Sequence, residues 1–194
     1  GGSNVARAIS HLGGNATALF PAGGATGEHL TALLKEENVA VDAIVSQDWT
    51  RQNLHVHVNA SGEQYRFVMP GAALTADELR LIEEKVLTIA PGSLLVISGS
   101  LPPGISVENL TQLVKNAQRH GLRCIVDSSG DALAAALDVG NIELVKPNQK
   151  ELSALVQRDL SQPDDVRLAA QELIRSGKVQ RVVVSLGAQG ALGV

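Results

Sequence analysis

Polar residues in the run 142–152, IELVKPNQKEL, lie where a strand is expected to give way to a helix. The apolar start of this run ends at Lys146 and Pro147, because proline lacks a backbone N–H and disfavours helical geometry in the residue before it. Asn148 is suited to cap the following helix, with Glu151 in the position of a capping-box partner. Open α/β sheets bind ligands at the carboxyl ends of their strands. The run is therefore a candidate binding site, with a well-capped turn lacking any ligand as the alternative.

Three further loops follow expected strands in the same way and are rich in glycine and serine. They are GSLPPG at 99–104, DSSG at 127–130 and SLGAQG at 185–190. Small residues and exposed N–H groups at helix N-termini suit the binding of polyphosphates and sugar hydroxyls. These loops contain neither a G-x-x-x-x-G-K-[ST] nor a G-x-G-x-x-G sequence. That argues against a P-loop NTPase and against a dinucleotide-binding fold of the G-x-G-x-x-G type.

Several other residues of chemical interest have a simpler structural interpretation. Asp127 is expected to cap a helix rather than to contact a ligand, since aspartate is favoured at that position. Cys124 lies in an apolar run and is expected to be a buried thiol rather than a nucleophile. His55 and His57 share one strand face, but a metal site needs three or four ligands, so a solvated face is the better interpretation.

The expected elements alternate in a way typical of an α/β protein with a parallel sheet. The runs LLVIS, RCIVD and RVVVS are almost continuously apolar, as are strands buried on both faces. Helices alternate with the strands and show apolar residues at helical spacing. The predicted helices are 4–12, 26–38, 75–89, 107–120, 131–137, 149–156 and 164–176. The predicted strands are 41–45, 94–98, 123–127, 142–145 and 181–185, and residues 16–24 are predicted to be a strand followed by a glycine-rich turn.

Residues 41–70 interrupt this alternation. The stretches 52–58 and 64–69 alternate apolar and polar residues, and the turn sequence NASG separates them. Strands joined without helices predict an antiparallel ribbon, which must cover a site or pair with a second chain. We therefore expect an α/β core of residues 1–40 and 71–194, with residues 41–70 as a β lid or dimer clasp.

Composition excludes several functional classes. The 194 residues carry 16 Lys and Arg against 20 Asp and Glu, and only 2% of them are aromatic. This balance argues against nucleic-acid binding. The hydrophobic content of 44% is enough for a sizeable core. A single cysteine fits a reducing compartment. Without a signal peptide or an apolar run of ~20 residues, the sequence predicts a cytoplasmic protein with no membrane span.

Four motifs, in this order, resemble those of the PfkB (ribokinase-like) family of carbohydrate kinases, and they extend over nearly the whole chain. The family signatures are matched by G-x-N-x-A at 2–6 with Gly13 and Gly23, by GSLPPG at 99–104, by VKPNQKEL at 145–152 and by SLGAQG at 185–190. WTRQN at 49–53 also resembles the hexose-phosphate branch of the family. The resemblance implies a three-layer, mostly parallel sheet with helices on both faces and a small β lid.

The resemblance implies ATP-dependent phosphorylation of a hexose phosphate, most simply fructose 6-phosphate to fructose 1,6-bisphosphate. Gly1, Gly2, Asn4, Arg51 and Ser100 would bind the sugar phosphate, the guanidinium of Arg51 being suited to a phosphate dianion. The structural alternatives are a helix N-cap for Asn4, a solvated turn arginine for Arg51 and a loop hydroxyl for Ser100. Tagatose 6-phosphate or fructose 1-phosphate as substrate, or a non-catalytic binding fragment, are the alternatives for function. A homodimer formed through the β lid is also expected.

By the same resemblance, Lys146, Asn148, Ser185, Gly187 and Gly190 would bind the phosphates of ATP, with the glycines letting backbone N–H groups approach closely. The carboxylate that would organise Mg²⁺, through water molecules, belongs to Glu151. For Lys146, the structural alternative is a surface lysine at the end of a strand.

The sequence departs from the family pattern at its two ends. It begins Gly-Gly-Ser-Asn without methionine, and it contains no G-A-G-D loop. In the family that loop supplies the general base and the N–H groups that stabilise the transferred phosphoryl group, worth about 10²–10⁴-fold and roughly 3–4 kcal/mol per donor respectively. We therefore expect no catalytic base among these residues, and a 194-residue chain that is inactive alone.

Overall fold

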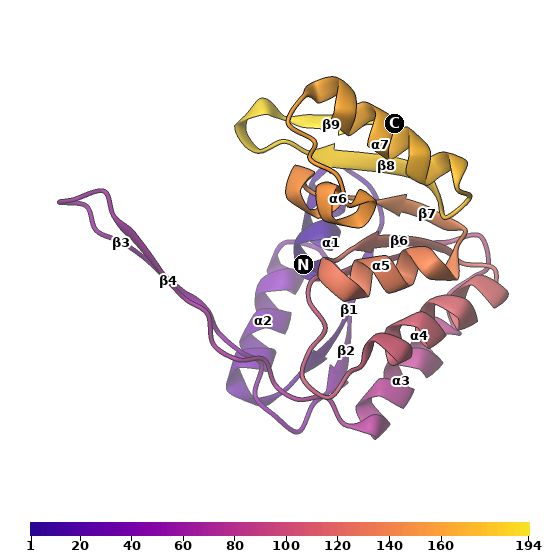
Figure 1. Ribbon diagram of the computed structural model, residues 1–194. Coiled ribbons are helices and arrows are strands. Elements are labelled where there is room, and N and C mark those ends of the chain that lie inside the picture. Colours follow the sequence, from indigo (N-terminus) through magenta and orange to yellow (C-terminus); the bar gives the residue numbers. More distant parts are fainter. The chain divides into compact units, whose positions relative to one another are not determined.

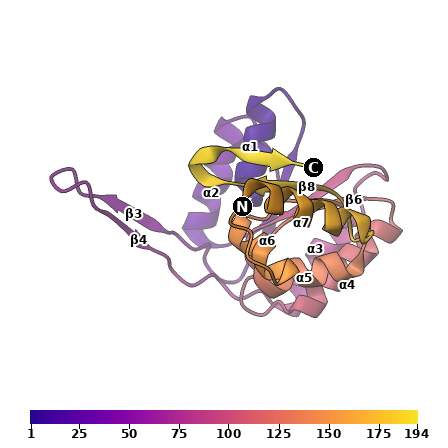
Figure 2. The same cartoon turned by 45° about the horizontal axis from the view of Figure 1, so that its top comes forward.

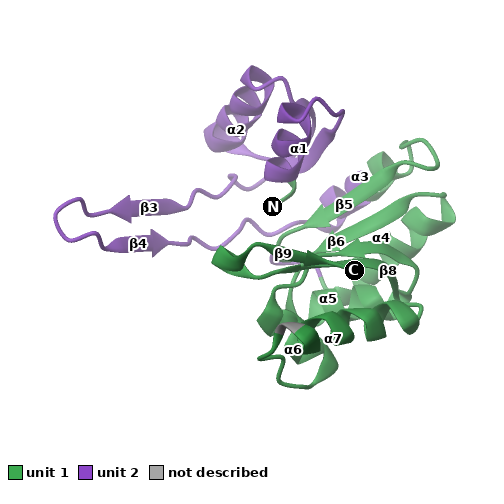
Figure 3. Cartoon of the chain, turned by 90° about the horizontal axis from the view of Figure 1, so that it is seen from above, with its two compact units in different colours: residues 1–2, 83–101, 106–194 green, residues 3–82, 102–105 purple. Residues whose placement is uncertain are grey.

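Four parallel strands bring their carboxyl ends to one edge of a sheet in the computed structural model of the protein (Figure 1). The structure describes residues 1–194 apart from the side chain of Pro163. The chain divides into two compact units, coloured separately in Figure 3. Unit 1 comprises residues 1–2, 83–101 and 106–194, and unit 2 comprises residues 3–82 and 102–105.

The sheet of unit 1 has the strand order β5-β6-β7-β8-β9. Its strands are β5 (Leu94–Ser98), β6 (Arg123–Asp127), β7 (Ile142–Val145), β8 (Val179–Ser185) and β9 (Ala191–Gly193). The first four are parallel, as their apolar sequences predict, and β9 returns antiparallel to β8. The short strand β9 was not among the predicted strands.

Helices connect these strands and pack on them (Figure 2). They are α4 (Val107–Arg119), α5 (Gly130–Val139), α6 (Gln149–Val156) and α7 (Pro163–Arg175). Helix α4 packs on α5 and β6, and α7 packs on α6 and β8. The core between them is aliphatic, and its fully buried members include Val114, Cys124, Val126, Leu133, Leu137, Ile142, Val145, Leu152, Val182 and Val184. Because Cys124 is buried there, its pKa is raised to about 11, which makes the thiol unreactive as expected.

Unit 2 contains a second, smaller parallel pair, β1 (Thr17–Ala22) and β2 (Ala40–Val45), joined by α2 (Gly24–Glu36). Helix α1 (Gly2–His11) begins in unit 1 and continues into unit 2, and α3 (Ala76–Val86) passes from unit 2 into unit 1. The buried residues of the smaller core are Ala6, Ala18, Leu34 and Val39.

The expectation that the strand at 41–45 belongs to an antiparallel ribbon is wrong. β2 pairs in parallel with β1 over six residue pairs, from Thr17 with Ala40 to Ala22 with Val45. The helix α2 provides the crossover that a parallel pair requires, so β2 completes a βαβ unit before the ribbon begins.

The ribbon itself consists of β3 (Leu54–His57) and β4 (Gln64–Phe67), paired antiparallel (Figure 1). These strands match the two alternating stretches of the sequence. All eight of their residues are exposed, which leaves Tyr65 and Phe67 each 49% accessible to solvent. The ribbon therefore presents apolar side chains that the described residues do not bury.

The fold class is confirmed as α/β with a mostly parallel sheet. Among the helices described, none has both the length and the apolar character needed to cross a membrane.

Candidate nucleotide and sugar-phosphate site

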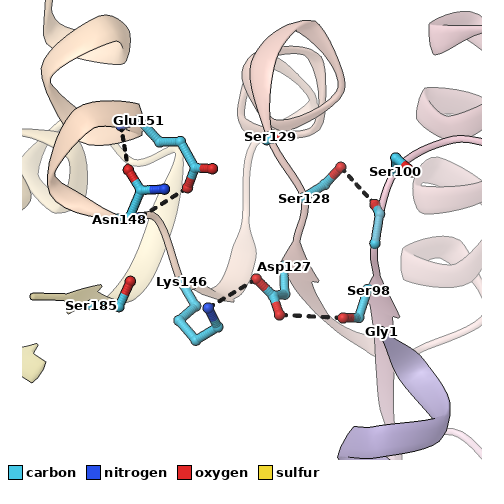
Figure 4. Close-up of a pocket in the computed structure, with 11 residues that line it drawn as sticks. Gly1, Ser98, Ser100, Asp127, Ser128, Ser129, Lys146, Asn148, Glu151 and Ser185 are labelled. Atoms are coloured by element: carbon cyan, nitrogen blue, oxygen red, sulfur yellow. Dashed lines mark hydrogen bonds and ion pairs between the residues drawn. The ribbon is translucent and has the colours of Figure 1, made fainter. Parts of the chain in front are cut away.

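A cavity of about 280 Å³ opens at the carboxyl ends of β5, β6, β7 and β8 in unit 1 (Figure 4). All of its lining residues belong to that unit. They are Gly1, Ser98, Gly99, Ser100, Asp127, Ser128, Ser129, Lys146, Asn148, Glu151 and Ser185. The sheet thus converges four strand ends on one polar hollow, which is where a parallel sheet places its ligands.

Asn148 and Glu151 form the reciprocal capping box that their spacing predicts. The Glu151 N–H donates to Asn148 Oδ1 at 2.8 Å, and the Asn148 N–H donates to Glu151 Oε2 at 2.8 Å. The Ser185 N–H donates to the Pro147 carbonyl at 3.0 Å, so the residues after β7 stay paired with the end of β8. These hydrogen bonds to backbone N–H groups fix the side chains of Asn148 and Glu151 at the N-terminus of α6, where both residues line the cavity.

Asp127 contacts two groups in the cavity and does not cap a helix. Its Oδ1 lies 3.1 Å from Lys146 Nζ, and its Oδ2 accepts a hydrogen bond from Ser98 Oγ at 3.2 Å. The expected capping role is wrong because β6 extends through Asp127, and the N-cap position of α5 falls on Ser129 instead. The carboxylate is therefore available to the site (Figure 4).

The β5 side of the cavity is built by close backbone contacts. Ser128 Oγ donates to the Gly99 carbonyl at 3.0 Å, which joins the loops that follow β5 and β6. A Cβ at Gly1 would lie 2.5 Å from the Ser98 carbonyl oxygen, so only glycine fits against the end of β5. Ser100 follows Gly99 in the sequence and also lines the cavity.

Gly187 and Gly190 form the tight turn that follows Ser185. The φ angles of both glycines are positive, and glycine adopts this region readily. The Leu186 N–H donates to the Gly190 carbonyl at 2.8 Å, which closes the turn. The turn lies next to the cavity in sequence, since Ser185 lines the cavity and the two glycines follow it.

The remaining predicted sugar ligands lie at the start of α1 and in unit 2. Gly2 is the first residue of α1, and Asn4 lies inside this helix, so the alternative role of Asn4 as an N-cap is wrong. Arg51 is exposed and its Nη1 donates to the Met69 carbonyl at 3.4 Å. The cavity therefore brings together six of the predicted residues: Gly1, Ser100, Lys146, Asn148, Glu151 and Ser185.

Sequence reasoning missed Ser98 and gave Asp127 a capping role. Ser98 and Asp127 are the last residues of β5 and β6, and both line the cavity. The sequence contains a usable signal, because Ser98, Asp127 and Ser185 each stand at the end of one of the apolar runs LLVIS, RCIVD and RVVVS. Of these three, Ser185 was predicted as a ligand-binding residue.

The side chains that line the cavity include one ammonium group, that of Lys146, and two carboxylates, those of Asp127 and Glu151, together with hydroxyl and amide groups. Lys146 can bind phosphate oxygens, and carboxylates of this kind suit a hard divalent cation. The side chains of Asp127 and Lys146 are 30% and 46% exposed, so incoming groups can reach both. Among the described residues, no group of three His, Cys, Asp or Glu side chains is placed to hold a metal ion.

The comparisons with known proteins agree with this geometry. The profile of the pfkB family carbohydrate kinases matches residues 1–194. The chain is 74% identical over 194 residues to the ATP-dependent 6-phosphofructokinase isozyme 2 of Escherichia coli K12, covering all of this chain and 63% of that relative. It is 39% identical over 193 residues to the protein of the same name from Mycobacterium tuberculosis H37Rv, covering 99% of this chain and 56% of that protein.

Among solved structures, the phosphofructokinase-2 of Escherichia coli in complex with fructose 6-phosphate superposes with a TM-score of 0.96 at 74% identity. The match covers all of this chain and 64% of that structure. The chain therefore spans less than two thirds of the length of these relatives.

Proposed function

Because the chain belongs to the pfkB family of carbohydrate kinases, we propose that its protein transfers the γ-phosphoryl group of ATP to a hexose phosphate. We take the substrate to be fructose 6-phosphate and the product to be fructose 1,6-bisphosphate, as the name of the 74%-identical relative suggests. The convergence of Lys146, Asn148, Glu151 and Ser185 on one cavity carries this proposal. The activity is that of the whole protein, since the chain spans only 63% of that relative.

The proposed role of Lys146 is to bind phosphate oxygens and neutralise their charge. Asn148, Ser185, Gly187 and Gly190 would line the path of the nucleotide phosphates, where a helix N-terminus and a glycine turn present N–H groups. Positioning and charge neutralisation supply most of the catalysis in phosphoryl transfer. These residues therefore hold the donor in line with the acceptor rather than react with it.

The donor set also fits Mg²⁺, with Glu151 as the proposed carboxylate and Asp127 3.1 Å from Lys146 across the same cavity. Mg²⁺ prefers oxygen ligands and retains water, which suits two carboxylates that form no three-ligand cluster among the described side chains. When bound, the ion neutralises charge on the phosphate oxygens.

The sugar would be bound by Gly1, Gly2, Asn4, Ser100 and Arg51. In the transfer, the O1 hydroxyl oxygen forms a bond to the γ-phosphorus while the bond to the β,γ-bridging oxygen breaks and ADP leaves. The hydroxyl proton goes to a general base. The chain has no Gly-Ala-Gly-Asp sequence, so we infer that the base is supplied from outside these 194 residues.

We further propose a homodimer formed through the ribbon β3–β4 and a cytoplasmic location. The exposed Leu54, Tyr65 and Phe67 support the dimer, because apolar side chains on a two-stranded ribbon are stabilised by burial against another surface. Sedimentation velocity on Phe67→Asp should then give a monomer where the unmodified protein gives a dimer. A dimer that persists in this variant would contradict the ribbon interface.

A coupled assay across hexose phosphates tests the activity and separates the candidates. We expect ADP release with fructose 6-phosphate from the intact protein, expressed with any encoded flanking residues. Faster turnover of tagatose 6-phosphate or fructose 1-phosphate would reassign the substrate. The absence of turnover with every sugar phosphate would favour a non-catalytic binding protein.

A thermal-shift titration of the same protein with MgATP tests the nucleotide site directly. Replacing Ser185 or Asn148 by alanine should abolish the stabilisation by MgATP. If the shift survives both substitutions, the nucleotide assignment is wrong, whatever the assay shows.

A further inference from the structure

Residues 46–51 form the first part of the connection from β2 to the ribbon and carry Arg51, the proposed ligand of the sugar phosphate. Both ends of this segment are fixed to the turn between β1 and α2. The Ser46 N–H donates to the Ala22 carbonyl at 3.0 Å, and the Thr50 N–H donates to the Gly23 carbonyl at 2.9 Å. The Gly23 N–H returns a hydrogen bond to Thr50 Oγ1 at 3.1 Å. The segment leading to Arg51 is therefore held at a defined distance from the turn.

The contact between the segment and the turn is close enough to require glycine. A Cβ at Gly23 would lie 1.9 Å from the Asp48 carbonyl oxygen. At Gly24, where φ is +62°, a Cβ would lie 2.5 Å from the Trp49 ring. Such contacts leave the backbone of residues 46–51 little freedom on this side.

On α3, a buried carboxylate fixes the middle of the same segment. Glu78 is 4% exposed, and its Oε1 accepts a hydrogen bond from the Gln47 N–H at 2.8 Å. Its Oε2 accepts from the Thr75 N–H at 2.7 Å and from Thr75 Oγ1 at 3.0 Å. The two oxygens thus serve different parts of the chain.

Oε2 of Glu78 helps to cap α3, whereas Oε1 takes no part in the cap. The Glu78 N–H donates to Thr75 Oγ1 at 3.2 Å. Thr75 and Glu78 therefore form a capping box at the start of α3, and a capping box needs only Oε2. The hydrogen bond from the Thr75 N–H, aided by that from the Gln47 N–H, outweighs burial and lowers the pKa of Glu78, so the group is ionised at neutral pH. A buried carboxylate is costly unless it is hydrogen-bonded, so its second oxygen strongly favours the observed place of Gln47.

We propose that Glu78 is a positioning residue for sugar-phosphate binding, acting through its Oε1 on Gln47 and thereby on the segment that presents Arg51. The inference rests on the proposed role of Arg51. It assigns to Glu78 a function separate from the capping of α3.

Two substitutions separate these functions in the intact protein. Glu78→Gln keeps a capping-box residue and one acceptor, but it turns an amide NH₂ toward the Gln47 N–H. Thr75→Ala removes the capping hydroxyl and leaves the contact between Oε1 and Gln47 in place. Asp77→Asn is the control, because it removes a carboxylate 88% exposed in the same helical turn.

We expect Glu78→Gln to raise KM for the sugar phosphate by roughly tenfold, the effect of losing a charge-assisted hydrogen bond. KM for MgATP should stay within about twofold. Thr75→Ala should lower Tm with both KM values unchanged, and Asp77→Asn should change none of them. Amide hydrogen exchange at residues 46–51 should accelerate in Glu78→Gln only.

An unchanged KM for the sugar phosphate in Glu78→Gln, or an equal rise in Thr75→Ala, would overturn the proposal. Unchanged exchange at residues 46–51 would overturn it as well. If the unmodified protein phosphorylates no sugar, the proposed function fails separately, and the exchange measurement alone then decides whether Glu78 fixes the segment.

Discussion

Charged side chains cluster at both ends of the strands β6 and β7, and the two clusters differ in how completely they are paired. At the amino ends, the buried Glu143 carboxylate receives the guanidinium of Arg123 at 2.6 and 3.0 Å and also contacts Arg181. Its side chain is 6% exposed. At the carboxyl ends, Asp127 and Lys146 meet through one contact of 3.1 Å, and both remain partly open to solvent.

This difference indicates that the cluster around Glu143 is structural and that the Asp127–Lys146 pair belongs to a candidate ligand site. Glu143 has its acceptors occupied by a fork-shaped guanidinium and a second arginine, so a new partner could bind only by breaking these bonds. The Asp127–Lys146 pair is a single, partly exposed contact, and ion pairs open to solvent contribute little to stability. Lys146 can therefore exchange the carboxylate for a phosphate at low cost.

The largest effect that this comparison predicts is on catalysis. In the intact protein, Lys146→Met should lower kcat/KM by about 10²-fold, as expected when one donor to a transferred phosphoryl group is lost. Tm should change little, because the ion pair is a single contact that is partly open to solvent. A steady-state assay and a thermal melt measure the two quantities. A large loss of Tm with kcat/KM retained would reverse the assignment of this cluster.

At the opposite ends of the strands the expected outcome is reversed. Arg123→Met leaves the Glu143 carboxylate with Arg181 alone, and a buried charge that loses a partner destabilises the fold. We expect Tm to fall by several degrees while the MgATP-induced thermal shift keeps its size. Arg158→Met, which removes the partner of a half-exposed Glu172, is the matched control and should leave Tm nearly unchanged.

The two capping boxes of unit 1 allow a finer comparison. Asn148→Ala should cost about 1 kcal/mol of stability through loss of the cap and should also abolish the MgATP shift. Ser106→Ala removes the equivalent cap of α4, where Asn109 is the partner, and should cost a similar amount with the shift intact. Loss of the shift in both variants would mean that destabilisation, and not the missing side chain in the cavity, prevents binding.

Much of the site could be predicted because its determinants are local in sequence. Pro147 ends β7 and Asn148 caps α6, and both effects operate within a few residues. The apolar runs placed β5, β6 and β8 for the same reason. Once these strands are parallel, their carboxyl ends must share an edge, so Ser100, Lys146 and Ser185 meet in one cavity.

What could not be predicted depends on partners distant in sequence. Asp127 has the residue type of a helix cap, and only the contact with Lys146, far along the chain, shows its place in the cavity. The pairing of β2 with β1 rather than with the ribbon is likewise long-range. Glu143 stands in an apolar strand with no local sign of Arg123 or Arg181. Local preferences determine the elements, whereas such pairings emerge only when the elements pack.

The smallest predicted effect concerns acid unfolding and tests the cluster of Glu143, Arg123 and Arg181 alone. The hydrogen bonds and charge of Arg123, aided by Arg181, lower the pKa of Glu143 below its usual value near 4.5. Just below pH ~4.5 the Glu143 carboxyl binds a proton in the unfolded chain but not in the folded protein. The ion pairs of Glu143 therefore stabilise the fold above pH ~4.5, and this stabilisation is lost as the pH falls through the lower pKa of the folded protein. Glu143→Gln should therefore make the decline in the free energy of unfolding below pH ~4.5 shallower, but not flat, because the pKa values of Glu37 and Glu78 are lowered too. Urea titrations at a series of pH values from neutral to well below pH ~4.5 measure this slope, with Glu172→Gln as the half-exposed control. Equal slopes in the unmodified protein and Glu143→Gln would show that the arginines do not hold this carboxylate ionised, and the contrast between the two ends of the strands would then disappear.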